Sequence, residues 1–407
     1  MGLKTLHRRI TEDLHINYFE ITKDDLEDIL KIFIRVNSGG TQLNKTDLLF
    51  STIVATWDNG REEIEGLLKL INEKGEKFNF TNEYLMRTCL MLTDGPITYK
   101  VNSFEADNVE KIKVEWPNIK NAVSKTVDLL VEFGFNFSLL TSQNATMLIA
   151  YYIMKGGDMG DASKKSLKNY LIHALLNGIY GSSQDQLIAV LRNALREERT
   201  TDGGKKEYVL KSKTFSFDEL LKVTLPLKKS LYVNEAGIDL YLTYKKGAAS
   251  FFVLSLLYPH LKYTEVSFHQ DHIHPAALFT KEKFIESGVP EEQWKEWSSL
   301  KDTIPNLQLM EGRQNVSKNA TEFKKWMEQL PQDKLENFCL SNYIPKEQDF
   351  DLANFISFYE ARKKKLKEAL KQVLAFSTTA VMVPTEEEPP YTEEEAEETI
   401  EQPMEAE

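Results

Sequence analysis

The residues best suited to chemistry lie in one short segment near residue 270. The 407-residue chain has only seven histidines. Three of them, His269, His272 and His274, fall within six residues, beside Asp271. Carboxylates bind hard divalent cations, and a neutral imidazole accepts a proton near neutral pH. This combination indicates metal-assisted acid–base chemistry.

A strand–strand–helix (ββα) unit would bring this segment together with polar residues further along the chain. Asn306 directly precedes the strand-like run Leu307–Met310, and Asn315 and Lys318 follow where a helix is expected. We expect the segment containing Asp271 to form the first strand. The helix would then place the Asn315 side chain back over the hairpin.

Each of these residues has an expected role in phosphodiester hydrolysis. Asp271 and Asn315 would bind one Mg²⁺ or Mn²⁺ ion through hard oxygen atoms. His272 would take a proton from water, and Asn306 would fix the orientation of the imidazole through a backbone hydrogen bond. Lys318 would stabilise charge on a phosphate, or else lie on a solvated helix face.

The roles of the other two histidines stay open at this point. His269 and His274 would each contact the metal or a phosphate, or would have a supporting or surface role. The basic residues between 192 and 213 likewise predict either a patch for the DNA backbone or a solvated helix and loop.

Helical periodicity dominates the elements that must position this unit. We expect Tyr208–Phe217 to form a short strand or an extended linker, and Asn306–Met310 to form a short strand. The expected helices are Asp24–Val36, Thr46–Trp57, Asn121–Phe133, Ala145–Met154, Leu167–Leu176, Ser183–Arg199, Leu240–Leu257, Lys281–Trp297, Asn315–Leu330 and Asp351–Leu374. The pattern predicts a mainly α fold with one small α+β module.

The net charge of −12 is concentrated at the C-terminal end. Eleven glutamates lie between Thr378 and Glu407, and the rest of the chain carries only −1. We expect this tail to be disordered. A nearly neutral body leaves room for local basic patches, so composition does not exclude a nucleic-acid partner.

The cysteines and the hydropathy pattern restrict the cellular setting. Only Cys89 and Cys339 are present, which is typical of reduced thiols and a cytoplasmic protein. No apolar run reaches the roughly 18 residues of a membrane span, and no secretory signal begins the chain. We therefore expect no membrane partner.

Two motifs resemble one known family. The sequence DHIHP at 271–275, followed by NLQLMEGRQN at 306–315 and a lysine three residues later, resembles the HNH motif. The closest form is that of the C-terminal nuclease domain of GmrSD-type modification-dependent restriction enzymes. Upstream, FIRVNSGGTQL at 33–43 is similar to the F-x-R-x-N-x-G-G-x-x-L signature of the ParB-like domain fused to those nucleases.

The resemblance extends over roughly residues 20–370 and implies a role for each matched position. In that family the histidine of the DH pair is the general base, which here is His272. The preceding aspartate and the last asparagine bind the metal, here Asp271 and Asn315. The middle asparagine, here Asn306, is the orienting residue.

The N-terminal part departs from the family in one respect. The D-G-Q-Q-R motif of the ParB-like domain is absent from this chain, which implies an incomplete ParB-like segment and makes NTP binding doubtful. A remnant of the nucleotide site would consist of Arg35, Asn37, Gly39 and Gly40. These glycines also have a plain structural interpretation as the exit from a helix.

The expected organisation follows from these motifs. Residues 1–60 would be the partial ParB-like segment, 61–255 a helical middle domain, 256–376 the HNH nuclease domain with closing helices, and 377–407 the acidic tail.

The implied function is a metal-dependent HNH DNA endonuclease in phage defence or restriction of foreign or modified DNA. Two alternatives remain open. The chain could be a DNA-binding or regulatory partner that needs a separate NTP-handling subunit, or a decayed, non-catalytic remnant.

Overall fold

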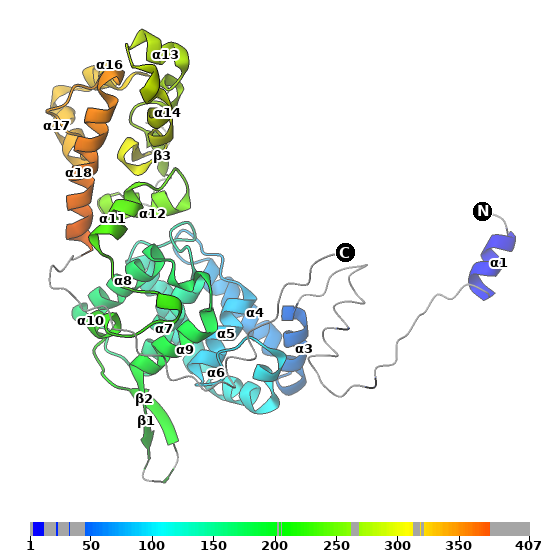
Figure 1. Ribbon diagram of the computed structural model, residues 1–407. Helices are drawn as coiled ribbons and strands as arrows, with labels where there is room; N and C mark the ends of the chain where they lie inside the picture. Colours follow the sequence, from blue (N-terminus) through cyan, green and yellow to red (C-terminus); the bar gives the residue numbers. More distant parts are fainter. Residues whose placement is uncertain are drawn as a thin grey trace. The chain divides into compact units, whose positions relative to one another are not determined.

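The described residues are mainly helical, as the sequence predicts (Figure 1). The computed structural model describes residues 3–11, 22, 32, 45–201, 203–204, 206–261, 268–311, 318 and 321–374. These residues contain two antiparallel sheets of two strands each. No helix in this described part of the chain is long and apolar enough to span a membrane.

Several predicted features lie outside the described residues. They are the acidic tail at 377–407, the helix Asp24–Val36 apart from Ile32, and the positions Arg35, Asn37, Gly39, Gly40 and Asn315. Their predictions therefore stay predictions.

The chain divides into two compact units, Met1–Lys69 with Thr81–Lys120 and Leu70–Phe80 with Asn121–Glu407. The first unit is helical. Its elements are α1 (Leu3–Thr11), α3 (Lys45–Thr56), most of α4 (Gly60–Asn72), α5 (Asn82–Leu92), the 3-10 helix η2 (Val101–Phe104) and the first part of α6 (Ala106–Glu132). Helix α3 confirms the prediction at Thr46–Trp57.

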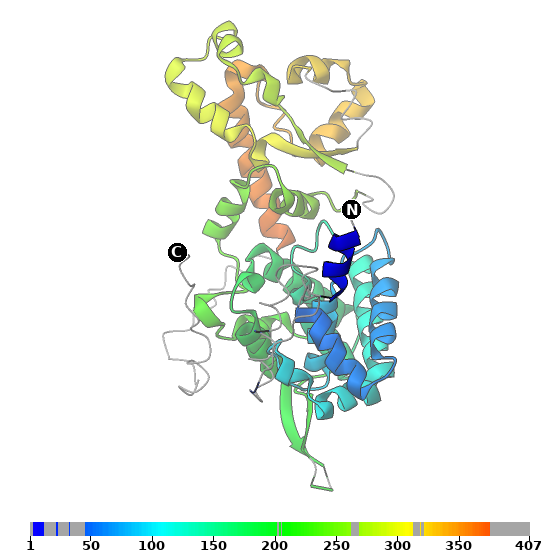
Figure 2. The same cartoon turned by 90° about the vertical axis from the view of Figure 1, so that its right-hand side faces the viewer.

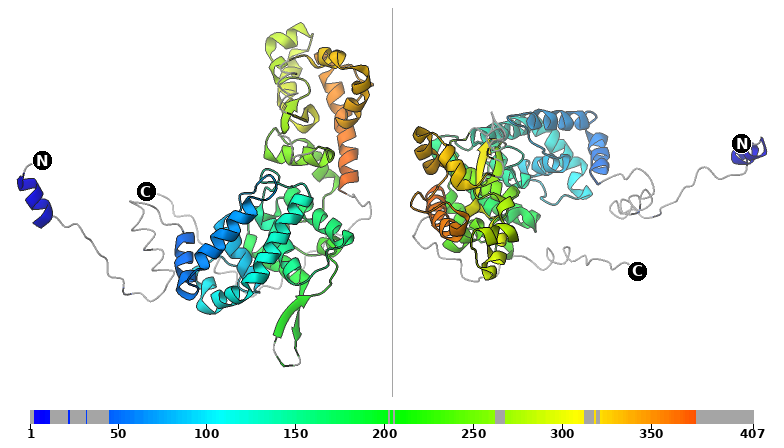
Figure 3. Two further views of the ribbon diagram at one scale, coloured as in Figure 1. Left: turned by 180° about the vertical axis from the view of Figure 1, so that it is seen from behind. Right: turned by 90° about the horizontal axis from the view of Figure 1, so that it is seen from above.

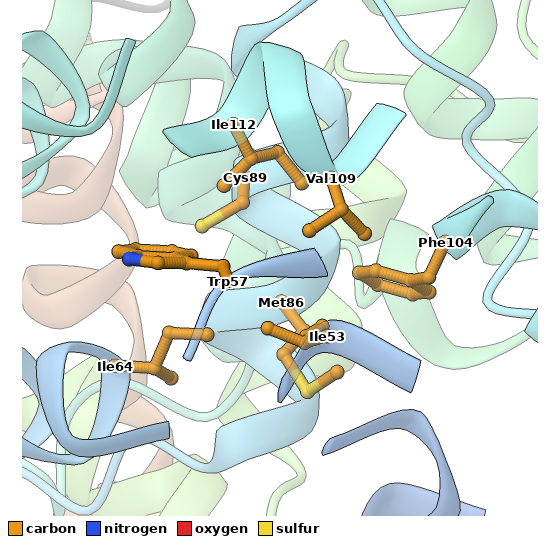
Figure 4. A pocket seen from close by; sticks show the side chains of 8 residues that line it. All are labelled: Ile53, Trp57, Ile64, Met86, Cys89, Phe104, Val109 and Ile112. Atoms are coloured by element: carbon orange, nitrogen blue, oxygen red, sulfur yellow. The ribbon is translucent and has the colours of Figure 1, made fainter. Parts of the chain in front are cut away.

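The core of the first unit is tightly packed around two tryptophans. The rings of Trp57 and Trp116 meet edge to face with centroids 5.1 Å apart. A void of only about 10 Å³ remains, lined by Ile53, Trp57, Ile64, Met86, Cys89, Phe104, Val109 and Ile112 (Figure 4). Burial raises the pKa of Cys89 to about 12, so this thiol is inert at neutral pH.

The second unit contains the rest of α6, further helices and both sheets. Its helical elements up to residue 257 are η3 (Gln143–Thr146), α7 (Met147–Met154), α8 (Asp161–Leu176), η4 (Ile179–Gly181), α9 (Gln184–Leu195), α10 (Phe217–Leu221), η5 (Pro226–Lys228), α11 (Glu235–Leu242) and α12 (Ala248–Leu257). Helix α6 begins well before the predicted Asn121, because buried Val109 and Ile112 extend its apolar face.

The helix predicted at Ser183–Arg199 ends early. Helix α9 stops at Leu195, and β1 (Arg196–Thr200) pairs with β2 (Lys206–Leu210) as an antiparallel hairpin. This hairpin projects from the neighbouring helices in Figures 1 and 2 and in the left view of Figure 3. The Arg196 guanidinium lies 3.7 Å from the centroid of the Tyr208 ring, and this cross-strand contact favours strand over helix.

The remaining elements form the second sheet and the helices around it. They are β3 (Phe268–His272), η6 (Ala276–Leu278), α13 (Lys281–Glu286), α14 (Glu291–Leu300), η7 (Ile304–Asn306), β4 (Leu307–Glu311), α16 (Phe323–Gln329), α17 (Gln332–Ser341), η8 (Leu352–Asn354) and α18 (Phe355–Val373). Strand β4 confirms the strand predicted at Asn306–Met310. The helix predicted at Asn315–Leu330 is not continuous, because residues 321–322 are non-helical.

The single helix predicted at Leu240–Leu257 is also two helices, α11 and α12. Between them the backbone forms hydrogen bonds with the segment that precedes β4. The Lys246 amide donates to the carbonyl of Asp302 (2.8 Å), and the Ile304 amide donates to Tyr244 (3.2 Å). These bonds replace helical ones and fix the chain around Asp302.

The helix predicted at Lys281–Trp297 is interrupted by a glycine and a proline. Gly288 adopts φ +68°, a left-handed conformation that ends α13. The amides of Val289 and Gly288 bond back to Phe284 (2.9 Å) and Ile285 (3.1 Å), a common helix ending. Pro290 then precedes α14.

A buried arginine on α18 joins this helix to the start of β4. The side chain of Arg362 is fully buried, and α18 packs against η7, the 3-10 helix that directly precedes β4. Its guanidinium donates to the carbonyls of Ile304 (3.2 Å), Pro305 (2.8 Å) and Leu307 (2.9 Å). It also donates to the Asn342 carbonyl (3.1 Å) and the Tyr258 hydroxyl (3.2 Å).

We expect both Arg362→Lys and Arg362→Met to lower the free energy of unfolding by about 3 kcal/mol, because each leaves buried carbonyls without donors. Chemical denaturation measures this loss. Lys364→Met, at an exposed position of the same helix, is the control and should change stability by less than about 0.5 kcal/mol. Wild-type stability of Arg362→Lys would show that one ammonium can replace the guanidinium bonds.

Candidate active site

Strands β3 and β4 form an antiparallel pair, called the β3–β4 hairpin below, and the connection between them contains α13 and α14. The register of this pair determines which side chains share a face. Asp271 pairs with Gln308, and His272 pairs with Leu307. Neighbouring residues of a strand point to opposite faces. His272 therefore lies on one face of the hairpin, while Asp271 and Gln308 lie on the other.

His272 forms a dyad with an aspartate that precedes β4. Its Nε2 lies 2.8 Å from Oδ1 of Asp302. The exposed fractions of the two side chains are 15% and 33%, so the pair borders solvent. Because a carboxylate accepts, Nε2 carries the proton when the imidazole is neutral, and the lone pair then lies on Nδ1.

The surroundings favour a neutral imidazole. Burial lowers the pKa of His272, the hydrogen bond to Asp302 opposes this shift, and the nearby charge of Lys246 lowers the pKa further. Burial raises the pKa of Asp302, but its hydrogen bonds to Lys301 and His272 outweigh burial and lower it. At neutral pH the dyad is thus an uncharged base beside a carboxylate.

Asn306 braces the backbone just after β3. Its side-chain oxygen accepts from the His274 amide (2.9 Å), and its Nδ2 donates to the carbonyls of His274 (3.1 Å) and Lys301 (2.8 Å). Its own carbonyl accepts from the Ile273 amide (2.8 Å). Asn306 is fully buried and holds the segment after His272 against the segment that carries Asp302.

Asp271 belongs to a second centre on the opposite face. Its Oδ2 accepts from Nζ of Lys318 (2.6 Å) and from Nε2 of Gln308 (2.8 Å). Lys318 also donates to the backbone carbonyls of His272 and Ile273. The ammonium therefore satisfies both the carboxylate and the end of the strand.

Lys318 does not lie on a solvated helix face, so that alternative is wrong. Its side chain is 0% exposed, whereas Asp271 is about one-tenth exposed. Burial lowers the pKa of Lys318, and the charge of Asp271 opposes this shift. Contact with a phosphate stays a prediction, and it would require the ammonium to leave Asp271.

The other two histidines have contrasting environments. His269 is exposed on β3. His274 is fully buried, and its ring meets those of Phe323, Phe355 and Phe358 edge-on with centroids 4.9–5.5 Å away. The surface position expected as one alternative for His274 is therefore wrong, because three aromatic rings cover it.

The residues around Asp271 fit a divalent cation in part. The Asp271 carboxylate and the amide oxygen Oε1 of Gln308 are hard donors of the kind that Mg²⁺ prefers. That amide oxygen is buried and has no hydrogen-bond partner in the described structure. However, Lys318 already provides a positive charge, and the described residues contain no cluster of three His, Cys, Asp or Glu side chains that could hold a metal.

Sequence reasoning missed four residues of these centres. Asp302 belongs to none of the motifs, and only its position just before the predicted strand Asn306–Met310 could have indicated that it lies in the site. Lys246 and Lys301 lie in separate loops, so their charge beside the dyad depends on tertiary structure. Gln308 could have been found from strand register, because a polar residue opposite Asp271 shares its face.

Comparison with models of known protein families and with curated proteins finds no match for this chain.

The His272 dyad makes a prediction about proton affinity. We expect His272 to titrate below its usual pKa of 6.5 in an NMR pH series. Asp302→Asn should lower that pKa further, because it removes the bond that favours the charged form, and Lys246→Ala should raise it. Lys245→Ala, the exposed neighbour, is the control. A raised pKa in Asp302→Asn would contradict the dyad.

The Asp271–Lys318 pair makes a prediction about stability. Lys318→Met leaves a buried carboxylate without its counter-ion and should lower the free energy of unfolding by about 3 kcal/mol. Adding Asp271→Asn should recover more than about 1 kcal/mol of this loss.

The matched control for this cycle is Lys325→Met. Lys325 pairs with Glu322 at an exposed site, so its replacement should cost less than about 1 kcal/mol. Equal effects of the two lysine variants, or strict additivity of Lys318→Met and Asp271→Asn, would refute the buried pair.

Proposed function

We propose that this chain is a metal-dependent DNA endonuclease of the HNH type, with His272 as the general base. The observation that carries the proposal is the His272–Asp302 dyad at the solvent border of the β3–β4 hairpin. A neutral imidazole oriented by a carboxylate is the usual arrangement for activating water or a hydroxyl.

The proposed reaction is hydrolysis of one phosphodiester bond. Nδ1 of His272 takes a proton from water while the water oxygen attacks phosphorus. The bond between phosphorus and O3′ breaks, and O3′ gains a proton from solvent. The products are a 3′-hydroxyl and a 5′-phosphate. Asp302 stabilises the imidazolium that forms, and the charges of Lys246 and Lys301 attract the phosphate.

A divalent ion bound by Asp271, with Gln308 and Asn315 as further oxygen donors, would supply electrostatic stabilisation of the phosphate in the transition state. In this proposal β3, β4 and the helical position of Lys318 correspond to the ββα unit of HNH nucleases. The ParB-like identity of residues 1–60 and a cytoplasmic role in restriction of foreign or modified DNA are proposed from the resemblance alone.

A second candidate is favoured by the environment of Asp271. Lys318 neutralises this carboxylate, and strand alternation separates it from His272. A chain in this state would bind DNA or regulate a partner and would cut only beside a separate NTP-handling subunit. The two candidates differ in whether the purified chain cleaves DNA by itself.

The first test is a cleavage assay on unmodified and glucosyl-hydroxymethylcytosine DNA with Mg²⁺, Mn²⁺ or EDTA. We expect metal-dependent cutting that falls at least about 100-fold in His272→Ala and about 10–100-fold in Asp302→Asn. The rate should rise with pH until His272 is neutral and then level off. His260→Ala, an exposed histidine outside the site, should cut like wild type.

Three other outcomes would change the assignment. Cutting that persists in His272→Ala would remove His272 as the base. Binding of DNA without cutting, followed by cutting once an NTP-handling partner is added, would favour the second candidate. A folded chain that neither binds metal nor cuts DNA would identify a non-catalytic remnant.

A further inference from the structure

A polar side chain on β3 shares the face of His272 without belonging to the dyad. Gln270 lies two residues before His272 on β3, so strand alternation places both side chains on the same face of the β3–β4 hairpin. The Gln270 side chain is half-buried. Its amide has both donors and an acceptor, and its hydrogen bonds go to the turn that precedes α12.

Gln270 fixes this turn at a single residue, Gly247. Its Nε2 donates to the Gly247 carbonyl (2.7 Å), and its Oε1 accepts from the Gly247 amide (3.3 Å). The same Oε1 accepts from Oγ of Ser250 (2.7 Å), which in turn accepts from the Gly247 amide (3.0 Å). One side chain therefore binds both polar groups of the Gly247 backbone.

Lys246 lies between two anchored peptide groups. The peptide before its Cα is held because the Lys246 amide donates to the Asp302 carbonyl (2.8 Å). The peptide after its Cα is held because the Gly247 amide bonds to Gln270 and Ser250. Each peptide is planar, and only two dihedral angles join the two planes. Anchoring both planes fixes the direction in which the Lys246 side chain leaves the backbone.

This direction matters because Lys246 is bonded to the residue that orients His272. The Asp302 carbonyl accepts from the Lys246 amide, and the Asp302 carboxylate lies 2.8 Å from Nε2 of His272. Lys301, the other cation beside the dyad, pairs with Asp302 (2.5 Å). Lys246 is exposed and forms no ion pair with any residue that the structure describes. Of these two cations, Lys246 is therefore the one available to an anion from solvent.

We propose that Gln270 is a positioning residue, which holds Lys246 beside the His272–Asp302 dyad as a contact for a backbone phosphate of DNA. Gln270 acts only through the turn before α12. This role rests on the proposed function, because it needs DNA as the ligand, but it does not need cleavage. Replacing Gln270 by a neutral residue leaves the charge of the chain unchanged and releases the Lys246 ammonium from its place.

The test is the salt dependence of DNA binding by the full chain, measured by fluorescence anisotropy with a labelled duplex in EDTA. Each contact between a cation and a phosphate adds about 0.9 to the slope of log Kd against log salt concentration. Lys246→Ala should therefore lower this slope by about 0.9 between roughly 50 and 200 mM KCl. Gln270→Met removes no charge but should lower the slope by a similar amount, because the released ammonium no longer contacts a fixed phosphate.

Two lysine backgrounds separate positioning from a general loss of stability. In Lys246→Ala, adding Gln270→Met should leave the slope unchanged, because the contact that Gln270 supports is already absent. In Lys245→Ala, which removes the same charge from the neighbouring exposed residue, Gln270→Met should still lower the slope. Gln293→Met, at a half-buried glutamine of α14, is the matched control and should bind DNA like wild type.

A second variant keeps the test decisive if Gln270→Met does not fold. Ser250→Ala removes the hydroxyl that donates to Gln270 and leaves β3 unchanged. It should also lower the slope, by less than Gln270→Met, and only where Lys246 is present.

The outcomes separate this role from the proposed function. An unchanged slope in Gln270→Met, or in Ser250→Ala where Gln270→Met does not fold, would overturn the role even in a chain that cuts DNA. Losses that add to that of Lys246→Ala, or an equal loss in Gln293→Met, would overturn it too, as would a wild-type chain that does not bind DNA. A loss of slope that requires Lys246 would support the role even in a chain without nuclease activity.

Discussion

The hydrogen bonds of one buried guanidinium support the whole candidate site. Arg362 places a charge inside the second unit, where an unpaired cation is costly. Five oxygen acceptors from three segments compensate this charge. Three of these acceptors are backbone carbonyls on either side of Asn306. Arg362 thereby fixes Asn306, Asn306 fixes the backbone of His274, and this anchors the end of β3 that carries His272.

The two faces of the β3–β4 hairpin have different electrostatic environments, because successive side chains of a strand point to opposite faces. On one face, Asp302 and His272 border solvent and carry a charge that changes with pH. On the other face, Asp271 and Lys318 form a buried ion pair whose net charge is zero. A two-stranded sheet is thin enough for both pairs to be held by the same few backbone bonds. The site is compact for this reason.

Local sequence patterns predicted the parts of this site that depend on local forces. The strand-like run at Asn306–Met310 placed β4 correctly, and the mainly α class followed from helical periodicity. Helical periodicity gave a wrong prediction where hydrogen bonds to a distant backbone segment replace those of a helix. Between α11 and α12, the Lys246 amide donates to Asp302 and the Tyr244 carbonyl accepts from Ile304, and these bonds end the helix. The role of Asp302 and the burial of Lys318 could not be predicted for the same reason, because both depend on which segments meet in three dimensions.

The three clustered histidines show why residue type alone cannot assign a catalytic role. His269 is exposed on β3, with no acceptor to select its tautomer among the described residues. His274 is buried among three phenylalanine rings, so it cannot take up a proton at neutral pH. His272 alone combines an orienting carboxylate, partial exposure and a neutral ring. These properties come from its position at the end of the strand, where the alternation of side chains turns it toward Asp302 and solvent.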